Sequence, residues 1–317
     1  MLYFHLFNIH KRVSQKDILI LTTGRSGGTW LLELISYQKG IRSISEPLSL
    51  SLVTHPRVNE FGSFRAGNGY SFIQKPIPLK SYFEDIFSGK LNPFSPIKTF
   101  RKNFRTYHYF TNRSVVKVCH GKGLIKWFAE NFDVDIIYFY RHPVPTALSM
   151  IKRRFNTKLA GLLEDELFIQ KYLSEKQLQF AKKIQKDGSE IEKFVLSWTL
   201  ENIIPLKTIS NGFDCYKLSY EELVLFPQKC IEWLSNNFKL NKAILEKKFH
   251  LSSSTTIKSF QKDEYKKNSS LINSWRNGLS EKVEKRIFEI VENYDVDLYT
   301  FGEDLPNKKY LNKSIIG

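Results

Sequence analysis

A glycine-rich turn near the start of the chain joins an apolar run to an amphipathic segment. Residues 17–23 (DILILTT) predict a strand, residues 24–28 (GRSGG) a turn and residues 29–37 (TWLLELISY) a helix. Backbone N–H groups and the positive end of a helix can hold a phosphate-like anion at such a junction. A tight turn without a ligand is the commoner interpretation of glycines that stand alone. The glycine-rich turn alone therefore does not establish an anion-binding site.

The turn lacks the residues of two common nucleotide-binding motifs. A P-loop ends in Gly-Lys-Ser/Thr, where the lysine reaches the β and γ phosphates and the hydroxyl holds magnesium. Here Gly28 is followed directly by Thr29, and the cation of the turn is Arg25. This arrangement suits an anion that has no β–γ phosphate chain. The dinucleotide pattern G-x-G-x-x-G is also absent.

A second strand and helix carry another candidate for anion binding. Residues 135–140 (DIIYFY) predict a strand, which Arg141 follows directly, and Pro143 opens a helix. Ligands of α/β proteins bind at the carboxyl edge of the sheet, and a guanidinium group matches a phosphate. Ser149 lies about two turns into this helix and can add a hydroxyl. We expect both units to belong to one parallel sheet.

The rest of the pattern predicts an α/β fold with a P-loop-like central parallel sheet flanked by helices. Further strands are expected at 41–45, 115–119 and 215–219, and helices after Pro227 and near 283–294. Residues 55–109 are rich in Pro, Gly, Ser, Phe and basic residues without a sustained period. We expect one domain over residues 1–317, with a long insertion after the second strand, at 55–110, that forms an acceptor-site lid.

Charge and composition restrict the class of partner. The 48 basic and 32 acidic residues leave a net charge of +16, which favours nucleic acid, membrane, phosphate or sulfate esters. Only three cysteines occur, with no Cys-x-x-Cys pair, which indicates a reducing compartment and no zinc site. No stretch reaches the roughly 18 apolar residues of a transmembrane helix, and residues 1–13 make a poor signal peptide. We therefore expect a cytoplasmic protein without a transmembrane segment.

Together, the two units resemble the sulfotransferases that use 3′-phosphoadenosine 5′-phosphosulfate (PAPS), in particular the carbohydrate-type and bacterial members. Residues 23–30 (TGRSGGTW) resemble the family's 5′-phosphosulfate loop, and residues 136–150 its 3′-phosphate segment. The resemblance implies the sulfotransferase fold and transfer of a sulfuryl group from PAPS to a hydroxyl, most naturally of a carbohydrate. It implies no metal.

The resemblance also implies which residues bind the 5′ end of the donor. Arg25 would contact the sulfuryl group and the 5′-phosphate, and Trp30 would lie near the adenine. Amides and a hydroxyl would come from Ser26, Gly27, Gly28 and Thr29.

At the 3′ end of the donor, the resemblance assigns the phosphate to Arg141 and Ser149. Two later segments resemble family segments in the expected order, residues 216–223 (YKLSYEEL) and 275–279 (WRNGL). By this likeness Tyr220 would approach the adenine and Arg276 would touch the 3′-phosphate.

Two residues are candidates for the base that removes the acceptor's proton, a role that contributes roughly 10² to 10⁴ in rate. Glu46 precedes Pro47, which is expected to hold it extended, and resembles the Glu-Pro base of carbohydrate-type and bacterial sulfotransferases. His120 resembles the base of the cytosolic members. One extra residue separates it from Lys117, however, which turns its side chain to the other face of a strand. We favour Glu46, with Lys117 or Arg25 stabilising the leaving oxygen.

Two other classes remain as alternatives. A divergent P-loop kinase or phosphotransferase would explain the turn, but not the missing Gly-Lys-Ser/Thr or the second arginine unit. A basic nucleic-acid-binding protein would explain the charge, but it leaves both strand–turn–helix units without a role. The acceptor, a carbohydrate or another small molecule, has no motif of its own in residues 55–109.

Overall fold

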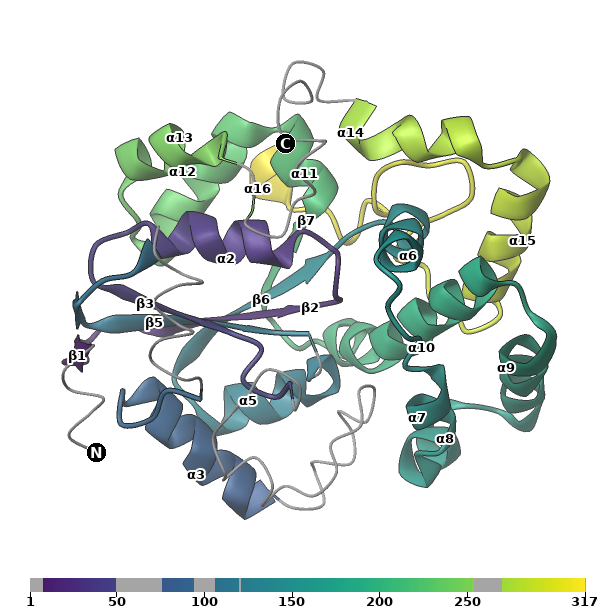
Figure 1. Cartoon of the computed structure of the whole chain (residues 1–317), viewed down its shortest axis with the longest axis horizontal. Helices are drawn as coiled ribbons and strands as arrows, with labels where there is room; N and C mark the ends of the chain where they lie inside the picture. Colours follow the sequence, from purple (N-terminus) through teal and green to yellow (C-terminus); the bar gives the residue numbers. More distant parts are fainter. Residues whose placement is uncertain are drawn as a thin grey trace.

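A five-stranded parallel sheet forms the centre of the computed structural model, which describes residues 8–49, 76–93, 106–119, 121–251, 253 and 270–316. The strand order is β3-β5-β2-β6-β7 (Figure 1). The strands are β2 (Asp17–Thr22), β3 (Ile41–Ser45), β5 (Arg113–Val118), β6 (Val134–Tyr140) and β7 (Tyr216–Ser219). A separate pair joins β1 (Ile9–His10) to β4 (Phe110–Thr111). The expected central parallel sheet is confirmed.

The sheet is covered on both faces, which explains its nearly continuous apolar strands. Every residue of β2 is buried. Leu19 and Leu21 belong to one hydrophobic cluster, whereas Ile18 and Ile20 belong to the other, as the alternation of side chains along a strand requires. Because β2 and β6 are neighbours paired from Asp17–Val134 to Thr22–Phe139, both anion-binding candidates follow adjacent strands.

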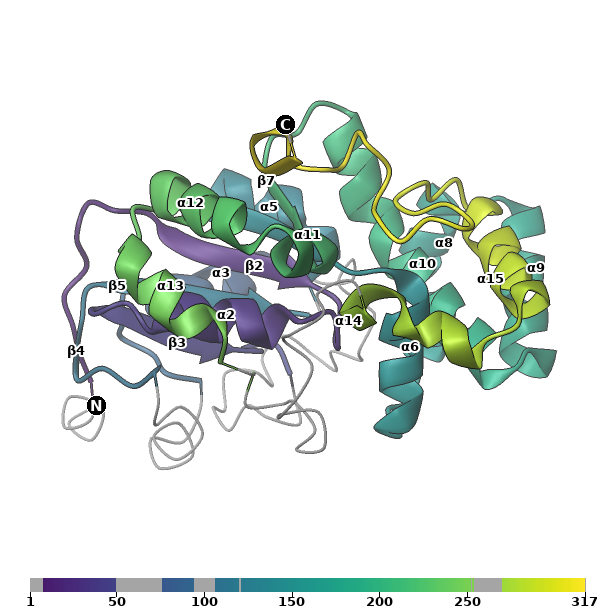
Figure 2. The ribbon, with the colours of Figure 1, turned by 90° about the horizontal axis from the view of Figure 1, so that it is seen from above.

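Helices form a layer on each face of the sheet (Figures 1 and 2). One layer consists of α2 (Gly28–Ser36), α11 (Tyr220–Leu225), α12 (Pro227–Phe238), α13 (Lys242–Phe249), α14 (Ser270–Asn273) and α16 (Lys313–Ile316). The other contains α3 (Pro76–Phe87), η4 (Lys122–Leu124), α5 (Ile125–Asn131) and part of α10 (Glu190–Ser210). Among the described helices, none is both long and apolar enough to cross a bilayer.

A group of helices lies beyond the edge of the sheet where β2 and β6 end and the helices α2 and α6 follow (Figure 1). It consists of α6 (Pro143–Lys152), α7 (Leu159–Leu163), α8 (Glu166–Tyr172), α9 (Glu175–Asp187), η7 (Ser274–Gly278), α15 (Glu281–Glu292) and the first part of α10. The long helix α10 packs on both α6 and α15, so it ties this group to the sheet. The carboxyl edge of the sheet therefore faces the helical group.

The segment expected to lack a regular period contains a helix. In α3, Leu79, Tyr82, Phe83 and Ile86 recur every three or four residues and are buried beneath the sheet. The expectation of no regular period was wrong for residues 76–87, where the first turn of the helix accommodates the prolines at 76 and 78. Of the expected lid at 55–110, residues 55–75 and 94–105 lie outside the described residues.

Candidate active site

The glycine-rich turn has a left-handed backbone at two positions. Gly27 is the N-cap of α2 with φ 87°, and Arg25 has φ 65°. A Cβ atom on Gly27 would lie 2.6 Å from Cδ2 of Tyr220, so both conformation and space require glycine. The Ser26 hydroxyl is buried and donates to the carbonyl of Thr23 at 2.6 Å. Ser26 therefore shapes the turn through its hydroxyl.

Arg25 and Arg141 meet at this turn. Nη1 of Arg141 donates to the carbonyl oxygen of Arg25 at 3.3 Å, and Nε of Arg25 donates to Oγ of Ser149 at 3.1 Å. These contacts bring the two predicted strand–turn–helix units together. Burial and the positive charges of Arg153 and Arg141 lower the pKa of Arg25. In the part of the chain that the structure describes, neither Arg25 nor Arg141 has a carboxylate ion-pair partner.

Tyr220 packs between the turn and Arg141. The guanidinium carbon of Arg141 lies 4.2 Å from the centre of the Tyr220 ring, a cation–π contact. The same ring touches the position that a Cβ of Gly27 would occupy, and its centre is 6.1 Å from that of Trp30. Trp30 itself is buried, edge-on to Phe249. Tyr220 thus orients Arg141 toward the turn, and Trp30 packs against the Tyr220 ring.

Glu46 does not have the extended backbone that the sequence predicted. Its φ is 63°, in the left-handed region that costs a non-glycine residue on the order of 1–3 kcal/mol. The cause is a change of direction after β3. The Glu46 N–H still bonds the carbonyl of Lys117 at 2.8 Å, and its own carbonyl already accepts from Ser49 in a turn. The strained backbone places the carboxylate beside β5.

The Glu46 carboxylate is paired with Lys117. Oε1 lies 3.0 Å from Nζ of Lys117, and Oε2 accepts a hydrogen bond from the Cys119 N–H at 2.9 Å. Lys117 also donates to Oγ1 of Thr29, at the start of α2, at 3.1 Å. Burial disfavours the lysine cation, but the charge and hydrogen bond of Glu46 outweigh it, and the pKa of Lys117 is raised. A carboxylate and an ammonium group therefore stand beside the N-terminus of α2.

Known proteins resemble this chain in structure and not in sequence. No protein-family model and no curated protein matches the sequence. In structure, the chain is similar to sulfotransferases. One is the sulfotransferase domain from the Synechococcus PCC 7002 olefin synthase, with 14% identity, a TM-score of 0.44, and 92% of this chain and 100% of that chain covered. Another is mouse sulfotransferase SULT7A1 complexed with PAP, with 15% identity, a TM-score of 0.42, and 90% and 88% covered.

Arg276, which the sequence resemblance assigns to the 3′-phosphate, forms ion pairs with two carboxylates. Its Nε lies 3.0 Å from Asp304 Oδ1, and its Nη1 lies 2.6 Å from Glu284 Oε2. The guanidinium group also stacks on Trp275 at 4.4 Å. Two carboxylates therefore already neutralise the positive charge of Arg276. His120, the alternative to Glu46 as the base, lies outside the described residues.

A histidine and a glutamate hold the backbone directly after Arg141. The His142 ring stacks on Trp275 with 4.8 Å between ring centres, and burial lowers its pKa well below the usual value, so it is neutral. The His142 N–H donates to Oε1 of Glu221 at 3.0 Å, and Tyr299 donates its hydroxyl to Oε2 at 2.7 Å. These contacts hold the residue that follows Arg141, and hence the end of β6.

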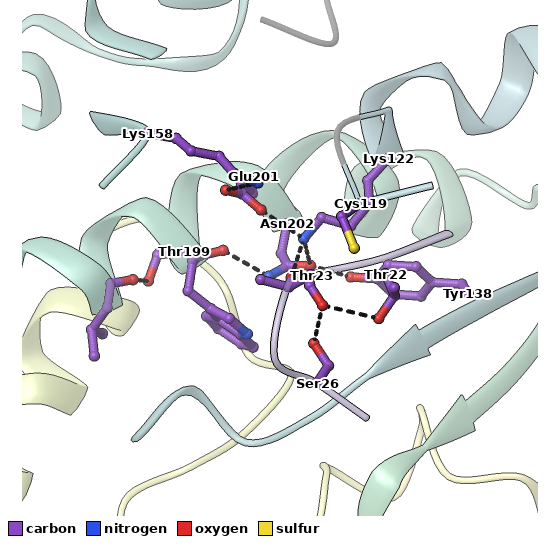
Figure 3. Close-up of polar contacts among 12 residues, drawn as sticks. Thr22, Thr23, Ser26, Cys119, Lys122, Tyr138, Lys158, Thr199, Glu201 and Asn202 are labelled. Atoms are coloured by element: carbon purple, nitrogen blue, oxygen red, sulfur yellow. Dashed lines mark hydrogen bonds and ion pairs between the residues drawn. The ribbon is translucent and has the colours of Figure 1, made fainter. Parts of the chain in front are cut away.

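A buried polar cluster beneath the turn was missed by the sequence analysis (Figure 3). It consists of Thr23, Lys122, Tyr138, Lys158, Glu201 and Asn202. Its members come from the turn, η4, β6, the segment before α7, and α10. No spacing along the chain connects them, because residues as far apart as 23 and 202 meet only in the fold. Among the described residues, no group of three His, Cys, Asp or Glu side chains could hold a metal ion.

Proposed function

We propose that this protein is a sulfotransferase that moves a sulfuryl group from PAPS to a hydroxyl acceptor, with a carbohydrate as the acceptor class. The observation that carries the proposal is the meeting of Arg141, Arg25 and Ser149 at the start of α2. Two guanidinium groups without carboxylate partners among the described residues form a site for an anion with more than one acidic group.

The residues at the turn fit the two ends of the donor. The N–H groups of Gly28 and Thr29 open α2 and have no acceptor within the helix, so they can bind the 5′-phosphosulfate. A Cβ on Gly28 would lie 2.7 Å from Cγ2 of Thr22, so only glycine fits this close packing. Arg25 would bind the same group, and Arg141 the 3′-phosphate. A sulfuryl donor has no β–γ phosphate chain, in agreement with the missing P-loop lysine.

Glu46 and Lys117 supply the chemistry of transfer. The acceptor oxygen attacks the sulfur atom, the bond between sulfur and the bridging oxygen breaks, and the electron pair stays on the 5′-phosphate. Glu46 takes the proton of the acceptor hydroxyl. Lys117 stands between Glu46 and Thr29, where its charge can stabilise the leaving oxygen. Arginine and lysine side chains provide all the positive charge that this reaction needs, so we expect no metal requirement.

The cytoplasm is the proposed location. The three cysteines are unpaired in the structure, as in a reducing compartment.

A thermal-shift measurement tests the donor class. Ligand at 100 times its dissociation constant stabilises the folded state by about 2.7 kcal/mol, which raises the Tm by several degrees. We expect 3′,5′-ADP without metal to give this shift and Mg-ATP to give little. The reverse order would favour a phosphotransferase, and a shift only with oligonucleotides would favour a nucleic-acid-binding protein. Transfer of label from PAPS to a panel of sugars, lipids and small alcohols then tests the carbohydrate acceptor.

A further inference from the structure

The ammonium group of Lys122 is buried and has three polar partners inside the protein. The residue is 3% exposed. Its Nζ lies 2.6 Å from Oγ1 of Thr23, 2.9 Å from Oδ1 of Asn202 and 3.4 Å from Oε2 of Glu201 (Figure 3). The first two contacts are hydrogen bonds and the third is an ion pair. Burying such a charge is costly unless it is fully paired, and here the partners come from two distant segments.

The first of these segments is the glycine-rich turn itself. Thr23 joins β2 to this turn, and the Thr23 carbonyl accepts from Oγ of Ser26 at 2.6 Å and from the Ser26 N–H at 3.3 Å. Lys122 therefore holds the residue around which the turn closes. A shift of Thr23 would carry Ser26 with it, and with Ser26 the neighbouring Arg25 and Gly27.

The second segment is α10, which anchors the other side of the contact. The Asn202 Oδ1 that receives Lys122 also accepts from the Tyr138 hydroxyl at 2.6 Å, and its Nδ2 donates to the Trp198 carbonyl. Glu201 lies between two ammonium groups, because its Oε1 is 3.2 Å from Nζ of Lys158. One strand and one helix of 21 residues thus form a rigid support for Lys122.

We propose that Lys122 is a positioning residue that fixes the glycine-rich turn to α10 through Thr23, so that the turn is already shaped when the donor arrives. The link to donor binding rests on the proposed function, whereas the link to the turn does not. The cluster also carries two ammonium groups against one carboxylate, which places positive charge beneath the proposed anion site. In agreement with this crowding, burial and Lys158 hold the pKa of Lys122 down at about 8, although Glu201 opposes the shift.

The test compares three variants by hydrogen exchange of the turn peptide in the ligand-free protein and by the Kd for 3′,5′-ADP. Thr23→Val keeps the shape of the side chain but removes the hydroxyl that accepts from Lys122, whereas Thr23→Ser keeps that hydroxyl. Lys158→Met removes the second ammonium group that pairs with Glu201 and makes no change in the turn. We expect Thr23→Val to raise turn exchange and the Kd by about tenfold each, the typical effect of losing a charged hydrogen bond. Thr23→Ser and Lys158→Met should leave turn exchange near that of the unaltered protein.

Two outcomes separate this inference from the proposed function. Unchanged turn exchange in folded Thr23→Val, or an equal rise across the whole chain, would overturn the positioning role. A selective rise of turn exchange in a protein that never binds 3′,5′-ADP would support the link from Lys122 to the turn and overturn the donor assignment. If Thr23→Val does not fold, Lys122→Met combined with Thr23→Ala in a double-mutant cycle gives the same answer, because each change removes the contact and additive effects on turn exchange would exclude it.

Discussion

Arg141 donates a hydrogen bond from Nη1 to the backbone carbonyl oxygen of Arg25 at 3.3 Å, although 116 positions separate them. The contact brings the end of β6 to the turn after β2, and the adjacent pairing of these two strands makes it possible. It leaves both guanidinium groups at one site, with Ser149 beside them. Because this is the observation behind the proposed function, it is the first to be tested by substitution.

Arg141→Ala should weaken binding of 3′,5′-ADP by about 10- to 100-fold, as expected for loss of a charge-assisted phosphate contact. Binding of 5′-AMP should fall much less, because it lacks the 3′-phosphate. Calorimetric titration of both nucleotides measures the difference. Arg276→Ala is the matched comparison and should retain 3′,5′-ADP affinity, since Glu284 and Asp304 already hold that guanidinium group. Equal losses for the two nucleotides would contradict a 3′-phosphate contact at Arg141.

The left-handed backbone of Arg25 gives a prediction for stability and binding together. Glycine adopts a φ of 65° without strain, so Arg25→Gly should be more stable than Arg25→Ala by about 1 kcal/mol. Both variants lose the guanidinium group and should bind 3′,5′-ADP equally weakly. Urea unfolding and titration measure the two quantities. If Arg25→Ala is more stable than Arg25→Gly, residue 25 does not have a left-handed backbone in solution.

Glu46→Gln should lower turnover by about 10² to 10⁴ while 3′,5′-ADP affinity is retained, because the amide cannot take the acceptor's proton. Single-turnover transfer of labelled sulfate from PAPS measures this step. His120→Ala is the necessary companion, since His120 is the rival base. An active Glu46→Gln enzyme together with an inactive His120→Ala enzyme would reassign the role to the histidine.

Glu221 predicts how stability depends on pH. Burial raises its pKa to about 7, although His142, Tyr299 and Arg141 all favour the carboxylate. The folded state then holds the proton more tightly than the unfolded chain, so the contribution of this group is complete below about pH 4.5 and is lost as the pH rises through about 7. Glu221→Gln cannot titrate, so its stability relative to the unaltered protein should rise from pH 5 to pH 8 by about 1 to 3 kcal/mol.

Thermal or urea unfolding at several pH values measures this difference. Glu130→Gln, at an exposed position of α5, is the matched control for the loss of a surface carboxyl group. A difference for Glu221→Gln that does not change with pH would mean that the folded protein keeps this carboxyl ionised at neutral pH.

The parts of the site that the sequence determined are local. Residues 17–37 and 135–149 each combine a short apolar run, a turn and a helical period, and the structure has these elements as β2–α2 and β6–α6. Such signals depend on neighbours along the chain, so periodicity and glycine placement suffice to predict them. The order of the two units also predicted that Arg25 and Arg141 share one edge of a parallel sheet. The helix α3 shows the limit of this approach, because prolines at its start concealed a clear apolar stripe.

Only the tertiary structure decided how the charges are paired. Arg276 has the same side chain as Arg141, yet Glu284 and Asp304 neutralise it, whereas Arg141 faces an aromatic ring and a carbonyl. The strained turn at Glu46 and the three contacts of Lys122 likewise depend on which segments pack together. The energy of a buried charge depends on its partners in space, and parallel strands with long connections bring those partners from distant parts of the chain.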